Sequence, residues 1–161
     1  MSIRIGSDVR RKEDLRLVIG AGCFSDDVNL PGQVYAVMVR SPHAHARIRS
    51  TATAEARAAD GVLAVLTGAD LLADGLKPIP HRPLLRGPPD ITLRNRDSSD
   101  ATTTPHYPLP ADKVRFVGEA VAMVVATSLG AAKAGAERVS VDYEPLDAVT
   151  RAMASAKTGA P

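Results

Sequence analysis

The sequence has few aromatic residues and almost no cysteine. Its 161 residues include two Phe, three Tyr and no Trp. Aromatic side chains bury the most surface each, so a core built mainly of Val, Leu and Ala predicts a domain that leans on something larger. Cys23 is the only cysteine. An intrachain disulfide is therefore excluded, and a reducing, cytoplasmic location is expected.

The chain also lacks a strong excess of either charge and any long hydrophobic run. Twenty Lys and Arg face 18 Asp and Glu, a net charge of +2. Nucleic-acid binding needs a clustered basic face, and the basic residues 10–12 are followed directly by Glu13 and Asp14. No stretch approaches the ~18 apolar residues of a membrane helix, and residues 2–6 lack the apolar run of a signal peptide. We expect neither a nucleic-acid nor a membrane partner.

The most informative stretch is residues 114–144, which predicts a strand, a helix and a strand. Residues 120–126 form an unbroken apolar run, typical of a strand buried on both faces. Ser128 can cap the helix that follows, where apolar residues recur at helical spacing. Residues 139–144 alternate between apolar and polar, as a half-exposed strand does. This pattern predicts a small α/β core.

The rest of the chain predicts an arm at residues 1–30, a domain at 31–150 and a tail at 151–161. Within the domain, residues 33–40 are apolar on both faces and are expected to form a second central strand. Further strands are expected at 45–51 and 62–67. A short helix over 54–59 is expected between them, with Thr53 as its cap.

Residues 76–112 differ from everything around them. They hold eight of the 12 prolines, a density at which no regular structure is expected. The segment is interpreted as a long excursion that is either disordered or laid over a neighbour.

Few residues suggest chemistry. His43 and His45 would point to the same side of a strand, as paired metal ligands can, but the spacing indicates no third ligand, and packing at a strand end is the preferred interpretation. Residues 20–22 resemble part of a dinucleotide-binding loop but predict a plain turn, because no strand and helix flank them. Cys23 is expected to be a small buried thiol rather than a nucleophile. Glu119 is expected to accept hydrogen bonds where the buried strand begins.

Several stretches together resemble one family. They are residues 11–16, 26–32, 40–48 and 113–122, with 141–146 following. In this order they are similar to the N-terminal α/β hammerhead domain of the molybdenum hydroxylase large subunit, the family of xanthine dehydrogenase, aldehyde oxidase and aerobic carbon monoxide dehydrogenase. The motif residues that carry the resemblance are expected to be structural: Ser41, Pro42, His43, His45, Gly118 and Glu119.

The resemblance implies an α/β (α+β) hammerhead fold, with a mixed sheet, two main helices and the proline-rich excursion. It implies a scaffold domain of a molybdopterin-binding large subunit, in an oxidoreductase that hydroxylates its substrate with oxygen derived from water. No catalytic, cofactor-binding or metal-ligating residue is carried over to this chain, so the chain alone is expected to be non-catalytic.

The partners implied are the molybdopterin-binding domains of the same subunit and the iron–sulfur and FAD subunits. The whole enzyme would carry molybdopterin-bound molybdenum, [2Fe–2S] clusters and FAD, with none of them in this chain. Two alternatives remain open: a free-standing interaction module with a polyproline-type surface, and an independent small enzyme built on Cys23 with His43 and His45.

One departure from the family concerns the helix after Ser128. It contains Gly130 and Gly135 where the family is usually richer in alanine. Each glycine is expected to cost about 1 kcal/mol of helix stability.

Overall fold

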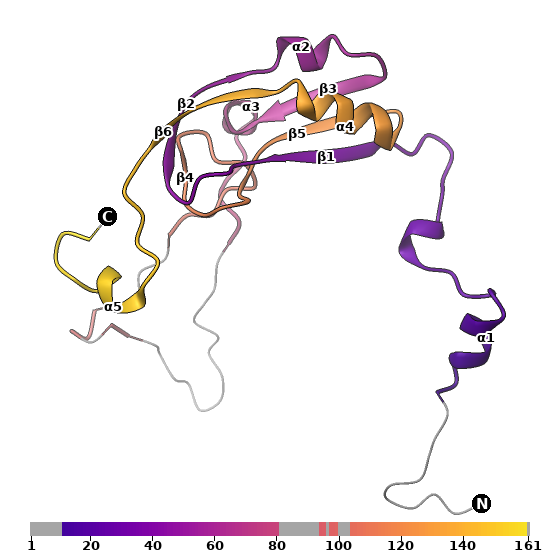
Figure 1. Cartoon of the computed structure of the whole chain (residues 1–161), viewed down its shortest axis with the longest axis horizontal. Coiled ribbons are helices and arrows are strands. Elements are labelled where there is room, and N and C mark those ends of the chain that lie inside the picture. The colour runs from indigo at the N-terminus through magenta and orange to yellow at the C-terminus, as the bar shows by residue number, and fades with distance from the viewer. Residues whose placement is uncertain (1–10, 81–93, 96, 100–103, 161) are drawn as a thin grey trace, which may run out of the picture. The chain divides into compact units, whose positions relative to one another are not determined.

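A computed structural model describes residues 11–80, 94–95, 97–99 and 104–160 (Figure 1). The chain forms two compact units, residues 1–33 and 34–161. In the first unit the helix α1 (Asp14–Val18) is followed by a 3₁₀ turn, η1 (Ser25–Asp27). Parts of the expected arm and excursion, including His81, lie outside the described residues.

The second unit contains two three-stranded sheets. One has the order β1 (Tyr35–Arg40), β5 (Ala120–Ala126), β3 (Val62–Thr67), and the other has the order β4 (Lys113–Val114), β2 (Ala46–Ala52), β6 (Ser140–Pro145). The mixture of helices and strands confirms the predicted α/β class. The arrangement of strands differs from the single mixed sheet that was expected, because each described strand pair is antiparallel and the strands divide between two sheets.

Consecutive strands alternate between the two sheets. β1, β3 and β5 form the first sheet, and β2, β4 and β6 form the second. Every link from one strand to the next therefore crosses from sheet to sheet, and no hydrogen-bonded pair is a hairpin of consecutive strands. All pairing is between strands that are distant along the chain, so turn residues cannot specify it.

Four short helices accompany the sheets in the described part of the second unit: α2 (Ala54–Arg57), α3 (Gly68–Ala73), α4 (Leu129–Glu137) and α5 (Ala152–Ser155). α4 contacts β1 and β5 (Figure 1). Its predicted cap is confirmed, because the Ser128 hydroxyl accepts a hydrogen bond from the Ala131 N–H at 3.1 Å.

The predicted cap of α2 is wrong. Thr53 has helical rather than extended backbone angles, φ −118° and ψ −4°, and its side chain accepts no capping bond. Its hydroxyl instead accepts a hydrogen bond from Arg57 Nε at 3.1 Å.

The central position of β5 is confirmed, but β1 is an edge strand rather than a central one. β5 lies between β1 and β3, whereas β1 pairs with β5 alone in the described structure. Along β1, half-buried residues alternate with exposed ones, and Met38 retains 41% of its surface. The apolar residues on both faces of β1 misled the prediction, because one of those faces is left open.

The fully buried core is small and made of aliphatic residues. Val65, Val124 and Ala56 form one cluster beneath α2 and α4, and Ala46, Val114 and Val121 form a second where the sheets meet. The largest fully buried side chains among the described residues are valines. This agrees with the scarcity of aromatic residues.

The two glycines of α4 have opposite surroundings. Gly135 is buried, and a Cβ there would lie 2.7 Å from Val62 Cγ2 and 3.0 Å from Val124 Cγ1. Gly130 has nothing within 4 Å of the same position. Gly135 therefore lets the helix approach the sheet closely, whereas Gly130 contributes only the flexibility of its backbone.

These surroundings predict opposite effects of the same substitution. Gly130→Ala should raise the free energy of unfolding by about 1 kcal/mol through helix propensity. Gly135→Ala should lower it by about 1–3 kcal/mol, because the added methyl group overpacks the core. Urea unfolding of both variants and the wild-type chain measures this. Changes of the same sign in both variants would show that α4 does not lie this close to the sheet.

Candidate functional site

Two of the sequence motifs meet at one place in the structure. Residues 41–45 link β1 to β2, and residues 115–119 link β4 to β5, so both segments cross between the sheets. The Ser41 N–H donates to the Glu119 carbonyl at 2.9 Å, and the Gly118 N–H donates to the Ser41 carbonyl at 2.8 Å. We call these two segments the crossover junction.

The junction extends the pairing of β1 with β5 beyond the ends of both strands. The register of this pair shifts between Val39 and Arg40. Past that irregularity the Arg40 guanidinium donates to the Gly118 carbonyl at 2.8 Å. Gly118 has a φ of +86°, a conformation that glycine adopts without strain. The turn that brings Glu119 back into the strand therefore depends on this glycine.

The two buried polar side chains of the described structure both lie in the junction. Ser41 is 2% exposed, and its hydroxyl accepts from the His43 N–H at 3.0 Å. Glu119 is 8% exposed, and its carboxylate accepts from the Arg115 N–H at 2.5 Å. Both side chains thus satisfy backbone groups of their own loops, which leaves neither poised for proton transfer to a substrate.

The two histidines of the junction contact different partners. The His43 ring lies 4.9 Å from the Tyr143 ring, measured between centroids. His45 Nδ1 lies 2.6 Å from the Asp147 carbonyl oxygen, and since a carbonyl only accepts, Nδ1 carries the proton. Both rings therefore attach the junction to β6 and the segment after it.

No metal-binding set accompanies these histidines. Within the described residues no group of three or more His, Cys, Asp or Glu side chains is arranged to hold a metal ion. His106 lies elsewhere, with its ring centroid 6.5 Å from that of Phe116.

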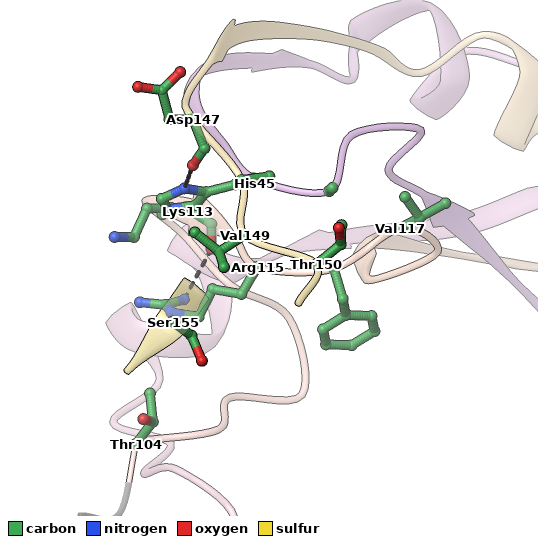
Figure 2. A pocket seen from close by; sticks show the side chains of 12 residues that line it. His45, Thr104, Lys113, Arg115, Val117, Asp147, Val149, Thr150 and Ser155 are labelled. Atoms are coloured by element: carbon green, nitrogen blue, oxygen red, sulfur yellow. Dashed lines mark hydrogen bonds between the residues drawn. The ribbon is translucent and has the colours of Figure 1, made fainter. Parts of the chain in front are cut away.

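A pocket of about 530 Å³ lies beside the junction (Figure 2). Its lining includes His45, Lys113 and Arg115 together with residues 147–150. Figure 2 shows the Asp147 carboxylate directed away from the other labelled side chains, while its carbonyl faces His45. Arg115 donates to the Lys113 carbonyl at 2.9 Å. The lining offers basic groups and a hydroxyl, but no pairing of a nucleophile with a base.

The remaining candidates lie in the first unit. Cys23 is exposed, so the expectation of a buried thiol is wrong. Residues 20–22 lie between α1 and η1, and the strand and helix that a dinucleotide loop requires do not flank them in the described chain.

Sequence reasoning missed two residues of this site, Tyr143 and Asp147. Asp147 is 102 positions from its partner His45, and no local spacing links residues so far apart. The alternation of β6 gave the only available signal, because it placed Tyr143 on the inner face of that strand.

Removing the Glu119 carboxylate should destabilise the junction. Glu119→Ala leaves the Arg115 N–H without its acceptor and should lower the free energy of unfolding by about 1–3 kcal/mol. Glu119→Gln retains an oxygen acceptor and should cost less. Urea unfolding of the two variants gives both values, and equal costs would show that the carboxylate hydrogen bond contributes nothing of its own.

Tyr143 should titrate at higher pH than an ordinary tyrosine. Burial raises the pKa of its phenol above the usual 10.0, against a smaller opposing effect of a hydrogen bond with Ser41. Because the folded state holds this proton more tightly, its stabilising contribution is complete below pH 10 and is lost as the pH rises through the raised pKa.

Absorbance at 295 nm, recorded between pH 8 and 12 for wild type and Tyr143→Phe, isolates this group. The difference curve should have its midpoint above 10. A midpoint at or below 10 would contradict the burial of the phenol.

No helix in the described ranges is both long and apolar enough to cross a lipid bilayer.

Comparison with known proteins identifies relatives of the whole second unit. The family model of the aldehyde oxidase and xanthine dehydrogenase a/b hammerhead domain matches residues 19–84 and 88–147. The carbon monoxide dehydrogenase large chain of Afipia carboxidovorans is 40% identical over 142 residues, which are 88% of this chain and 15% of the relative. The xanthine dehydrogenase molybdenum-binding subunit of Escherichia coli O157:H7 is 34% identical over 143 residues, 87% of this chain and 17% of the relative.

Solved structures agree. The crystal structure of the Cu,Mo-CO dehydrogenase superposes with a TM-score of 0.77 at 37% identity, covering 97% of this chain and 17% of the solved chain. Quinoline 2-oxidoreductase from Pseudomonas putida 86 gives 0.74 at 37% identity, with 93% and 17% covered. The chain thus spans about one sixth of these relatives. It belongs to the aldehyde oxidase and xanthine dehydrogenase a/b hammerhead family, a domain of the large subunits of molybdenum hydroxylases.

Proposed function

We propose that this chain is the scaffold and interface domain of a molybdenum hydroxylase large subunit and supplies no catalytic residue. The observation that carries the proposal is the internal use of the junction's polar groups. The Ser41 hydroxyl and the Glu119 carboxylate, the side chains best suited to a buried reaction, accept hydrogen bonds from their own loops. They hold the two sheets together, as a scaffold requires.

The residues of this chain do not fit the cofactors of such an enzyme. A [2Fe–2S] cluster takes four thiolate ligands, and the chain has one cysteine. The described residues contain no group of three His, Cys, Asp or Glu side chains suited to a metal, and every buried side-chain nitrogen or oxygen among them has a partner. Molybdopterin-bound molybdenum, the iron–sulfur clusters and FAD are therefore assigned to other polypeptide, and no step of the reaction is assigned to this chain.

The partners proposed are the molybdopterin-binding domains of the large subunit together with iron–sulfur and FAD subunits. Relatives bear names of the same kind: a nicotine 6-hydroxylase large subunit and subunit gamma of the 6-hydroxypseudooxynicotine dehydrogenase complex, both from Paenarthrobacter nicotinovorans. The reaction proposed for the assembly is oxidative hydroxylation with oxygen derived from water. A cytoplasmic location is part of the proposal and rests on the single cysteine.

The domain boundaries are part of the same proposal. We assign residues 1–30 to an arm, 31–150 to the hammerhead domain, with 76–112 as its excursion, and 151–161 to a tail. The division of the chain after residue 33 and the end of the family match at residue 147 support this assignment.

The alternative of a free-standing interaction module receives no support. The relatives are enzyme subunits, and they match across the body of the chain rather than over the proline-rich segment alone. The independent enzyme built on Cys23 is not supported either, because Cys23 is exposed and lies in a different unit from His43 and His45.

A pull-down from the native host tests the proposed function. The chain, tagged at its own locus, should recover larger polypeptides together with molybdenum and iron in amounts stoichiometric with the chain. A host that expresses the tag alone is the control. A metal-free chain recovered without larger polypeptides would contradict the proposal.

A further inference from the structure

The sheet formed by β1, β5 and β3 has one face covered by helices. Gly135 of α4 approaches Val62 and Val124, and Ala56 of α2 clusters with Val65 and Val124. Side chains alternate between the faces of a strand, and directly paired residues share a face. The register pairs Val124 with Val37 and with Val65, which places these residues on the helix-covered face.

The same register defines the opposite face. Met123 pairs with Met38 on one side and with Leu66 on the other, while Val125 pairs with Ala36 and Ala64. We call this set the open face; its members are Ala36, Met38, Ala64, Leu66, Met123 and Val125. Ala36 and Met38 are exposed, Met38 to 41%, and the other four are half-buried.

The chemistry of the open face is wrong for a surface that stays in water. Antiparallel sheets with one solvated face carry polar residues there. Here each of the six outward positions is apolar, and none bears a charge or a hydrogen-bonding side chain. β1 is also an edge strand. Natural edge strands usually carry charges or proline that discourage association, so the open face is built to be covered.

The absence of charge narrows the choice of occupant. Interfaces that resemble a domain core cut in half belong to permanent contacts, whereas transient ones are more polar. A second copy of this chain is disfavoured by area. The six side chains expose roughly a few hundred Å², on the scale of an ordinary surface patch, against about 800 Å² per partner in a standard interface. A contact within one chain is not bound by that limit, because its covalent connection supplies a high effective concentration.

We propose that the open face is the surface on which the molybdenum-binding remainder of a hydroxylase large subunit packs. This inference rests on the proposed function. The length comparison supports it, because this chain corresponds to 15–17% of its relatives, and most of a related large subunit is therefore polypeptide of the kind that could cover this face.

The test places a charge on the open face and a matched charge elsewhere. Met38→Glu and Ala36→Glu each alter an exposed position of the open face on β1. Leu129→Glu alters the first residue of α4, where leucine is 46% exposed. Each variant replaces the wild-type gene at its own tagged locus, so that every assembled complex must use it. Molybdenum and the large polypeptide recovered with the chain are then quantified.

Wild type and Leu129→Glu should recover equal amounts of both, while Met38→Glu and Ala36→Glu should recover at least tenfold less. The unfolding midpoints of the purified variants should match that of the wild type, because both open-face positions are already exposed. Molybdenum recovery by the two open-face variants at the wild-type level would overturn this inference and leave the proposed function intact.

Two other outcomes also decide the question. A wild-type chain that recovers no molybdenum would overturn the proposed function and this inference together. Sedimentation equilibrium of the purified chain gives the last readout, for which a monomer is expected. A wild-type dimer that Met38→Glu dissociates would show that a second copy covers the face, and would overturn the inference.

Discussion

The structure depends on satisfying the backbone where the chain crosses between its two sheets. Each link between consecutive strands makes such a crossing. At the junction two crossings lie against each other, and their N–H and carbonyl groups pair reciprocally through Ser41, Gly118 and Glu119. A buried backbone group without a partner costs free energy comparable to a lost hydrogen bond, so these loops have little freedom in sequence. This explains why the motif residues cluster in space although they are dispersed along the chain.

A second constraint is the thinness of the core. The fully buried side chains are small and aliphatic, and α4 reaches the sheet only because Gly135 offers no side chain. Such a core buries less area than one with aromatic residues. The apolar surface left on the open face fits the same picture, in which part of the stabilisation of this domain comes from polypeptide outside it. A scaffold domain of a large enzyme subunit has this economy, because its neighbours are always present.

The fold elements with strong local signals were predictable from the sequence. Residues 120–126 formed the central strand, and Ser128 capped the helix after it. The family motifs indicated the hammerhead class, which the comparisons confirmed. The errors occurred where tertiary context overrode local pattern. The apolar faces of β1 predicted a central strand, Thr53 adopted helical angles instead of capping, and Cys23 was exposed. The candidate site was only half visible, because the partners of His43 and His45 lie about 100 residues away.

The sequence by itself determined the local elements, the family and the absence of a thiolate set for an iron–sulfur cluster, since these follow from composition, periodicity and motif order. Tertiary structure alone decided how six strands divide between two sheets, because every pairing is non-local and no turn specifies it. It also decided that Gly135 is required while Gly130 is not, a difference set by the distance to Val62 and Val124. The open face was decided in the same way. The apolar pattern of β1 is present in the sequence, but only the register shows which half of it this chain leaves uncovered.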